Sequence, residues 1–108
     1  MMSMLTSGKG KYKVWLKKDK IGDSLLFVLG GGEKPHIGGV VVCEPGKKSQ
    51  VIRLKGHFDD IVLKPIAETA CKKYNKKVVA VGGVHVDNAT KEEIDILVEN
   101  CCDLSKNL

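Results

Sequence analysis

Long hydrophobic segments are missing from this sequence of 108 residues. The longest apolar runs, at residues 25–29 and 40–43, are far shorter than the roughly 20 residues that a membrane-spanning helix needs. Residues 1–8 also lack the basic segment followed by an apolar one that marks a secretory signal. We therefore expect a cytoplasmic protein with no membrane partner.

Arginine and aromatic residues are scarce. The formal net charge is +5, but Arg53 is the only arginine among 18 basic residues, and aromatic residues make up 5% of the chain. Base reading and base stacking depend largely on arginine and aromatic side chains. We therefore expect no nucleic-acid partner, and we interpret the lysines as solvated residues at the edges of the fold.

The spacings of common cysteine sites are also absent. The four cysteines form no Cys-x-x-Cys pair, which structural zinc sites and thioredoxin-like redox sites usually carry. We expect small buried thiols in a reducing compartment. No serine, cysteine or paired carboxylate stands beside a histidine in an activated arrangement, although His57 with Asp59 or Asp60 forms a possible base and its orienting acid. An independent enzyme is not expected.

Five segments have the patterns of strands. Residues 11–17 nearly alternate polar and apolar side chains, which is typical of an edge or near-edge strand with one wet face. Residues 24–29, 37–43 and 77–84 are apolar on both faces, so we expect them to be central and covered on each side. A further strand is predicted at residues 50–54.

Two segments have helical spacing. Residues 59–75 place apolar side chains on one side, with Asp59 or Asp60 as the N-cap. Pro65 would delete a backbone hydrogen bond beyond the first turn, so the regular helix is expected to begin only at Pro65. Thr90 and Glu93 match a capping box at the start of the second helix.

The element order predicts an α+β fold, ββββαβα, in which two helices cover one face of a mainly antiparallel five-stranded sheet. We expect one domain over residues 1–108, with residues 1–10 as a flexible N-terminal extension. Two helices cover a single face of such a sheet, yet the central strands are apolar on both faces. The sequence therefore predicts a homodimer or a partner protein on the other face.

Three sequence motifs surround the histidines of the chain. They are GGEKPHIG at residues 31–38, GHFDD at 56–60 and GVHVDNATKEEI at 83–94. With these motifs the sequence, from about residue 11 to 100, resembles the LpdD-like family. The resemblance implies the small D subunit of UbiD-type hydroxyarene decarboxylases, described as a prenylated-flavin chaperone, with a fold similar to the proteasome assembly chaperones. It implies prenylated FMN as a transient cofactor and the decarboxylase large subunit as the partner, but no residue-level assignment.

A cofactor site at the glycine-rich loop is the first hypothesis for these motifs. Glycine-rich turns expose backbone N–H groups that bind phosphate, and histidine and lysine add donors for an anionic flavin. Alternatively, the glycines only form tight turns at strand ends and the histidines bond nearby carbonyl groups. The candidate cofactor-binding residues are Gly31, Gly32, Lys34, His36, Gly38, His57, His85, Asp87 and Asn88.

A metal site is the second hypothesis, with His36, His57, His85 and Asp87 as ligands for zinc or iron. Its weakness is that no two histidines lie close enough in sequence to share one element. The functional alternatives to a flavin chaperone are therefore a general protein-assembly chaperone of the proteasome type and a small metal-binding protein.

Overall fold

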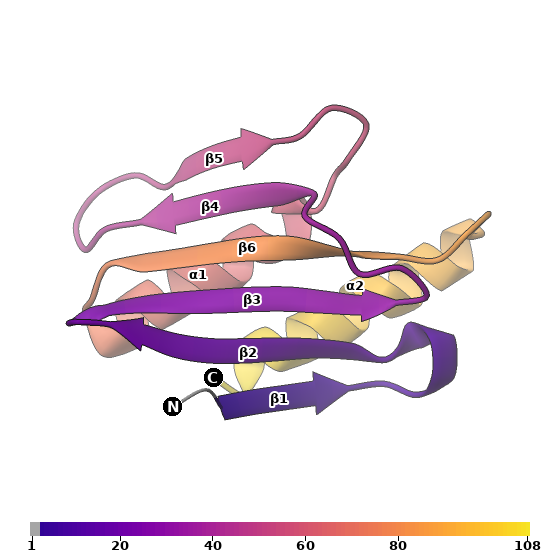
Figure 1. Cartoon of the computed structure of the whole chain (residues 1–108), viewed down its shortest axis with the longest axis horizontal. Helices are drawn as coiled ribbons and strands as arrows, with labels where there is room; N and C mark the ends of the chain where they lie inside the picture. The colour runs from indigo at the N-terminus through magenta and orange to yellow at the C-terminus, as the bar shows by residue number, and fades with distance from the viewer. Residues whose placement is uncertain (1–2) are drawn as a thin grey trace.

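Six strands form one mixed sheet in the computed structural model, which describes residues 3–108 (Figure 1). The spatial order of the strands is β1-β2-β3-β6-β4-β5. In chain order the elements are β1 (Ser3–Ser7), a short 3₁₀ helix (Gly10–Tyr12), β2 (Val14–Ile21), β3 (Ser24–Gly32), β4 (Gly39–Cys43), β5 (Gln50–Arg53), α1 (Asp60–Tyr74), β6 (Val78–His85) and α2 (Lys91–Lys106).

The sheet confirms the α+β class with two helices, but the predicted number and order of strands were wrong, because the sheet has six strands and is mixed, with four of its five pairings antiparallel. Strand β6 lies between β3 and β4, and it runs parallel to β3 and antiparallel to β4. Hydrophobic periodicity identifies a two-sided strand without identifying its neighbours. Helix α1 returns the chain to the middle of the sheet, where a strand that is apolar on both faces loses the most contact with water.

Strand β1 occupies the N-terminal segment for which we expected a flexible extension. It pairs antiparallel with β2, with Leu5 opposite Leu16, and Ser7 Oγ donates a hydrogen bond of 2.9 Å to Asp103 Oδ2 on α2. Most of its side chains are exposed, so it carries little of the apolar alternation that marks a strand. Backbone pairing with β2 and the contact with α2 explain its position.

Helix α1 begins at Asp60, earlier than the predicted start at Pro65, which lies inside the helix. A proline there removes one backbone hydrogen bond, but the same turns bury Leu63 and Ile66 completely. Helix α2 confirms the capping box: Thr90 Oγ1 accepts from the Glu93 amide at 3.2 Å, and Glu93 Oε1 accepts from the Thr90 amide at 3.1 Å.

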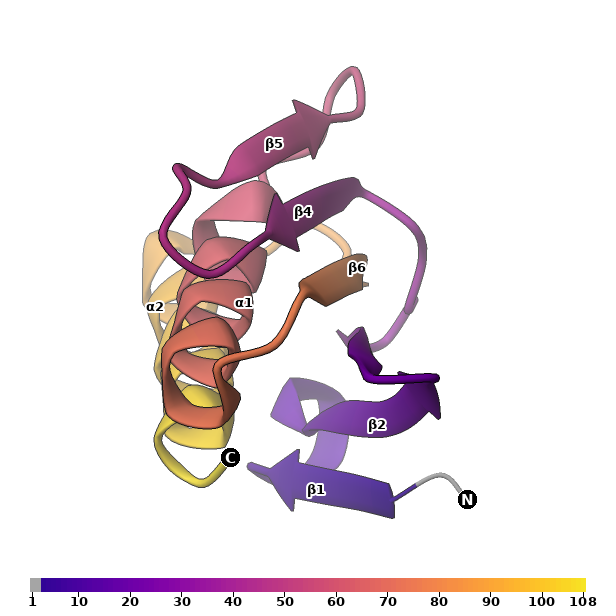
Figure 2. The ribbon, with the colours of Figure 1, turned by 90° about the vertical axis from the view of Figure 1, so that its left-hand side faces the viewer.

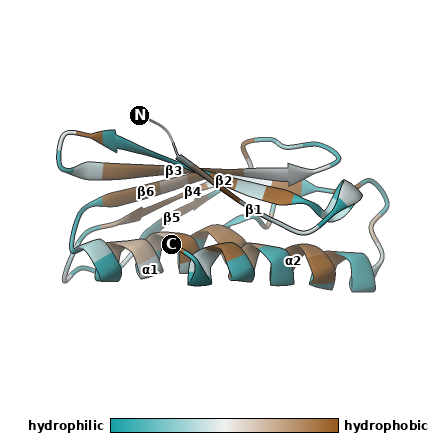
Figure 3. Cartoon of the chain, turned by 90° about the horizontal axis from the view of Figure 1, so that it is seen from below, coloured by the Kyte–Doolittle hydropathy of each residue, from teal (hydrophilic) through white to brown (hydrophobic). Residues whose placement is uncertain are grey.

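Both helices lie on the same side of the sheet, as the end-on view shows (Figure 2). Alternate strand residues point into this layer, and Leu16, Phe27 and Leu29 are at most 2% exposed. Figure 3 shows the helices as one layer beside the sheet, with apolar residues along the central strands. The hydrophobic core therefore lies between the helices and the sheet.

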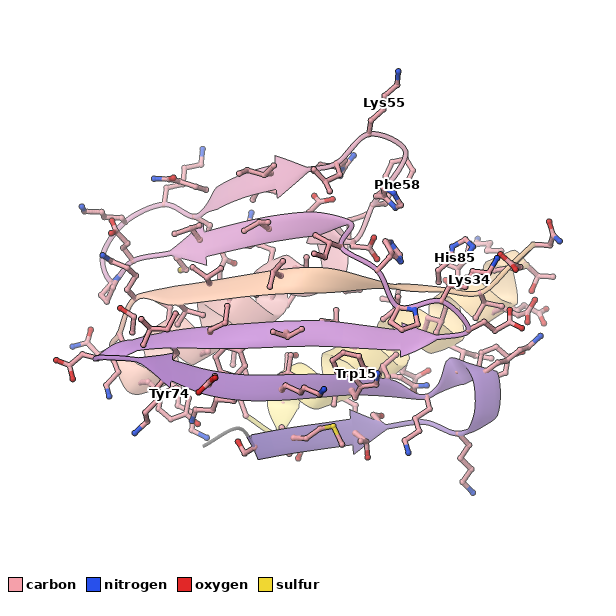
Figure 4. All side chains as sticks on the ribbon, in the orientation of Figure 1. Trp15, Lys34, Lys55, Phe58, Tyr74 and His85 are labelled. Atoms are coloured by element: carbon pink, nitrogen blue, oxygen red, sulfur yellow. The ribbon has the colours of Figure 1, made fainter. Side chains whose placement is uncertain are left out.

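The opposite side of the sheet, which we call the open face, is also apolar. Strand register places one row of side chains across all six strands on this face, namely Met4, Lys17, Val28, Val81, Val40 and Ile52. Val28 and Val81 are half-buried and Ile52 is 56% exposed. Figure 4 views the molecule from this side, with Trp15 lying over the ribbon.

The four cysteines are free thiols, and the expected burial holds for Cys43, Cys71 and Cys101, whereas Cys102 is partly exposed. Burial raises the pKa of Cys101 to about 12, and burial with the neighbouring Cys43 raises the pKa of Cys71 to about 11. These two thiols stay protonated at neutral pH, which makes them poor nucleophiles. Among residues 3–108, no helix has the length and apolar character needed to cross a membrane.

Candidate functional site

Three connections that are distant in sequence bring the three histidines together at one end of the sheet. His36 follows β3, His57 precedes α1, and His85 is the last residue of β6. The ring centroids of His36 and His57 are 4.6 Å apart, and those of His36 and His85 are 6.1 Å apart. Figure 4 shows His85, Lys34 and Phe58 at this end. The strand ends therefore form a single histidine cluster.

Asp59 lies at the base of the cluster and is 8% exposed. Its Oδ2 is 2.9 Å from His36 Nε2 and 3.8 Å from His57 Nδ1, while its Oδ1 accepts a hydrogen bond of 3.0 Å from the Val84 amide. The closest histidine partner of Asp59 is therefore His36, 23 positions away in the sequence, rather than the neighbouring His57 that sequence proximity suggested.

The sequence also predicted Asp59 as a cap for α1, and the structure corrects this role. Asp59 does occupy the N-cap position, but its backbone is helical and its side chain makes no hydrogen bond to the first helical amides. The carboxylate instead faces His36 and Val84. An aspartate before a helix has the same sequence signature whether it caps the helix or serves a site beside it.

Two glycines make room for the Asp59 carboxylate. A Cβ atom at Gly38 would lie 1.9 Å from Asp59 Oδ2, and a Cβ atom at Gly83 would lie 2.7 Å from Asp59 Cγ. Any larger residue would displace the acid. Gly32 has another purpose, because its φ is +72° and a Cβ atom there would lie 2.3 Å from the His85 carbonyl oxygen. It allows β3 to pass close to the backbone of β6.

A cavity of about 370 Å³ opens beside the cluster, lined from the end of β6 and the first two turns of both helices. Its polar end is formed by the three histidines and Asp59. Its apolar wall includes Phe58, Val62, Val84, Ile94, Leu97 and Val98. The cavity therefore combines hydrogen-bonding groups with aliphatic and aromatic side chains in one lining.

The structure divides the predicted cofactor residues into two groups. His36, His57, His85 and Asn88 line the cavity. The others, which are not among its lining residues, are Gly31, Gly32, Lys34, Gly38 and Asp87. Sequence reasoning named Asp59 only as a possible partner of His57 and as a helix cap, left it out of the cofactor and metal sets, and missed the apolar wall from α2. The GHFDD motif pointed to Asp59, but the helical pattern assigned it to the cap.

Lys34 and Asp87 form an exposed ion pair near the cavity. Lys34 Nζ is 2.8 Å from one Asp87 oxygen, and His85 Nε2 is 3.0 Å from the other. Hydrogen bonds from Lys34 and then His85 lower the pKa of Asp87, and the same pair raises the pKa of Lys34. Of the four predicted metal ligands, His85 and Asp87 therefore form a surface pair, while His36 and His57 gather around Asp59.

Comparison with known proteins confirms the resemblance seen in the sequence. The family model described as the prenylated flavin chaperone LpdD-like domain matches residues 8–108. Protein LpdD of Lactiplantibacillus plantarum is 24% identical over 112 residues, which cover 99% of this chain and 82% of that protein.

The fold also resembles a solved structure. A chain from the crystal structure of a novel chaperone complex for yeast 20S proteasome assembly superposes with a TM-score of 0.55. The match covers 98% of this chain and 96% of the yeast chain at 13% identity. At this identity the likeness concerns the fold alone, and it confirms the expected similarity to proteasome assembly chaperones.

Proposed function

Since this chain belongs to the LpdD-like prenylated flavin chaperone family, we propose that it binds prenylated FMN and delivers it to a UbiD-type decarboxylase. It acts as an accessory protein in the cytoplasm and catalyses no reaction of its own. The observation that carries the proposal is the cavity beside the histidine cluster.

The cavity suits the chemistry of a prenylated flavin. Its volume of about 370 Å³ falls within the roughly 300–1,000 Å³ of typical small-molecule sites. The aliphatic wall from α2 offers apolar contact to the ring system and its prenyl addition, and the histidines offer donors to polar groups. Lys34 lies near the same end and can attract a phosphate at the rim. The residues present therefore fit an amphipathic flavin.

The lining supports storage and transfer rather than covalent chemistry. Within the described chain, the cavity lining contains no serine, threonine, cysteine or lysine that would act as a nucleophile. The high pKa of the buried Cys71 and Cys101 thiols removes them as nucleophiles elsewhere. Free thiols also suit the reducing cytoplasm.

The open face supports a homodimer as the working assembly. Its central valines are only half-buried, so a second copy placed against them would remove apolar surface from water. The yeast chain of similar fold comes from a chaperone complex. The cavity is lined from α1 and α2, on the other side of the sheet, so pairing of two open faces leaves it accessible to a client decarboxylase.

A titration with a matched pair of variants tests flavin binding. Ile94 lines the cavity, whereas Ile96 on the same helix does not, and they are 49% and 39% exposed. Ile94→Asp places a charge against the flavin ring and is expected to weaken prenylated FMN binding at least about tenfold. Ile96→Asp is expected to change it by less than about twofold. Anaerobic calorimetry and flavin fluorescence measure both.

Plain FMN provides a second comparison. The prenyl addition buries more apolar area, worth roughly 25 cal/mol per Å², so prenylated FMN is expected to bind more tightly. Equal effects of Ile94→Asp and Ile96→Asp would show that the flavin binds elsewhere. If neither flavin binds below about millimolar, a binding free energy of only about −4 kcal/mol, the chain is no flavin carrier. A general protein-assembly chaperone then becomes the better interpretation.

A further inference from the structure

We propose that His36, His57 and Asp59 form a binding site for one divalent transition-metal ion of the zinc type at the polar end of the cavity. The ligand atoms are His36 Nε2, His57 Nδ1 and an Asp59 carboxylate oxygen, which all lie within 4.8 Å of one another. The three ligand residues line the cavity proposed for the flavin, but the metal site is argued from their own geometry and its test uses no flavin.

The spacing of the three side chains is close to that of a zinc site. With metal–ligand distances of about 2.1 Å, two ligands of a tetrahedral ion are about 3.4 Å apart. Asp59 Oδ2 lies 2.9 Å from His36 Nε2 and 3.8 Å from His57 Nδ1, on either side of this value. Shifts of a few tenths of an ångström bring these two contacts to the tetrahedral value, and the two histidine nitrogens, which lie within 4.8 Å of one another, close further around the ion.

The hydrogen bonding of His36 leaves a place for either a proton or a metal ion between it and Asp59. His36 Nδ1 is 3.0 Å from the Lys34 carbonyl oxygen, to which it can only donate. In a neutral ring, Nε2 then carries a lone pair, and it faces the Asp59 carboxylate at 2.9 Å. Two lone pairs at this distance require a proton between them, carried by the ring or by the carboxyl group, or a metal ion. A backbone carbonyl is one of the usual partners of the far ring nitrogen in a metal-bound histidine.

The surroundings of Asp59 hold the carboxylate in the position of a ligand. The Val84 amide fixes one oxygen, and Gly38 and Gly83 leave space that no side chain could share with the acid. A buried carboxylate also needs compensating positive charge. Among the described ion pairs, however, Asp59 has only histidine partners, because Lys34 pairs with Asp87 and Arg53 pairs with Asp60.

Three protein ligands leave one position of a tetrahedral ion free, as in sites that bind an exchangeable water or anion. All three ligand residues line the cavity, so this position is accessible from it. His85 is engaged by Asp87 at 3.0 Å and is excluded from the proposed ligand set. Imidazole and carboxylate ligands suit zinc, and cobalt(II) serves as its spectroscopic substitute.

Metal titration of chelator-treated protein tests the site. Zinc is measured by calorimetry and cobalt(II) by visible absorption, with one ion expected per chain and no cobalt–thiolate absorption in the near ultraviolet. His57→Ala and Asp59→Asn are expected to weaken binding at least about tenfold. The matched controls are His85→Ala and Asp87→Asn, a neighbouring histidine–aspartate pair, with changes below about twofold expected. Circular dichroism confirms that each variant is folded.

The outcomes separate this proposal from its rivals. Absence of zinc and cobalt binding in folded wild type would overturn it and leave a proton between His36 and Asp59. A cobalt–thiolate band would place the ion on a cysteine and would also overturn it. Equal losses in the His85→Ala and His57→Ala variants would refute the ligand set. Flavin titration of the same metal-free protein is a separate measurement, so the two proposals can fail independently.

Discussion

The two faces of the sheet have the same apolar character in the sequence, but their side chains are buried to different extents in the structure. On the helix side, Phe27 is 1% exposed. The next residue, Val28, points to the open face and is only half-buried. The difference arises because both helices cover one side, so the apolar alternation alone does not indicate what a face contacts. The helix side is the core, and the open face is a surface for association.

The largest expected effect tests the helix side. Phe27→Ala should lower the free energy of unfolding by about 3–5 kcal/mol, because it removes a large side chain from a fully buried position. Val28→Ala, its neighbour on the open face, should cost less than about 1 kcal/mol in the monomer. Urea denaturation at low protein concentration measures both. Similar losses would mean that the two faces contribute equally to the monomer core.

The second prediction tests the open face. Light scattering at micromolar concentration should give wild type about twice the chain mass of 11.8 kDa. Val81→Asp, at the centre of the open face, should give monomers because two opposed carboxylates would be buried at the interface. Ile52→Asp should weaken the dimer less, because Ile52 lies on the edge strand β5.

Val51→Asp is the control for the dimer experiment. Val51 precedes Ile52, points to the helix side of the same strand and is 42% exposed. The Val51→Asp variant should therefore remain a dimer. A monomeric wild type would refute the homodimer, and dissociation of the Val51→Asp variant would show that the dimer uses the edge of the sheet instead.

A smaller effect is expected where the helix layer joins the N-terminal segment. Hydrogen bonds from Lys11, the Thr90 amide and Tyr12 lower the pKa of Glu93 from 4.5 to about 2. Because the folded pKa is below the unfolded value, the stabilising contribution is present above about pH 4.5 and is lost as the pH falls to about 2. Glu93→Gln should therefore destabilise the fold at neutral pH, and the difference from wild type should disappear near pH 2.

Denaturation across this pH range checks the Glu93 prediction. Glu92→Gln, at the exposed neighbouring acid, controls for removal of one negative charge from the first turn of α2. A constant difference between the Glu93→Gln variant and wild type at every pH would show that packing, rather than the charge of Glu93, stabilises this contact.

The smallest effect is expected at the edge of the sheet. Ser7→Ala removes the exposed hydrogen bond to Asp103 and should cost about 0.5 kcal/mol or less. Hydrogen exchange of the β1 amides should accelerate slightly while the central strands keep their protection. A loss of protection in β3 or β6 would show that β1 supports the whole sheet.

Local sequence signals determined much of the secondary structure and the general position of the site. Alternation and two-sided apolar runs located the strands from β2 to β6, and Thr90 with Glu93 located the start of α2. These signals are local because they depend on side-chain direction along one element or on contacts within one turn. The motifs around the histidines identified the family, and the structure places His85 at the end of β6 and the other two histidines in the connections beside the sheet.

Tertiary structure decided the features that depend on distant partners. The position of β6 between β3 and β4 was fixed by the crossover through α1, and β1 was fixed by its pairing with β2. Pro65 is tolerated within α1 because burial of the surrounding side chains offsets one missing hydrogen bond. The sequence contains each of these residues, but their contributions to the stability of the fold depend on neighbours that only the tertiary structure supplies.

Asp59 shows, within a single residue, the difference between what the sequence determined and what the tertiary structure decided. The sequence places Asp59 before a helix, where a cap is the usual role of an aspartate. The fold instead brings His36, from 23 positions away, and two glycines to the Asp59 carboxylate. A residue beside a helix start thereby becomes the buried acid beneath a histidine cluster. Residue types and spacing supplied the components, and the convergence of three strand-end connections decided which of them meet.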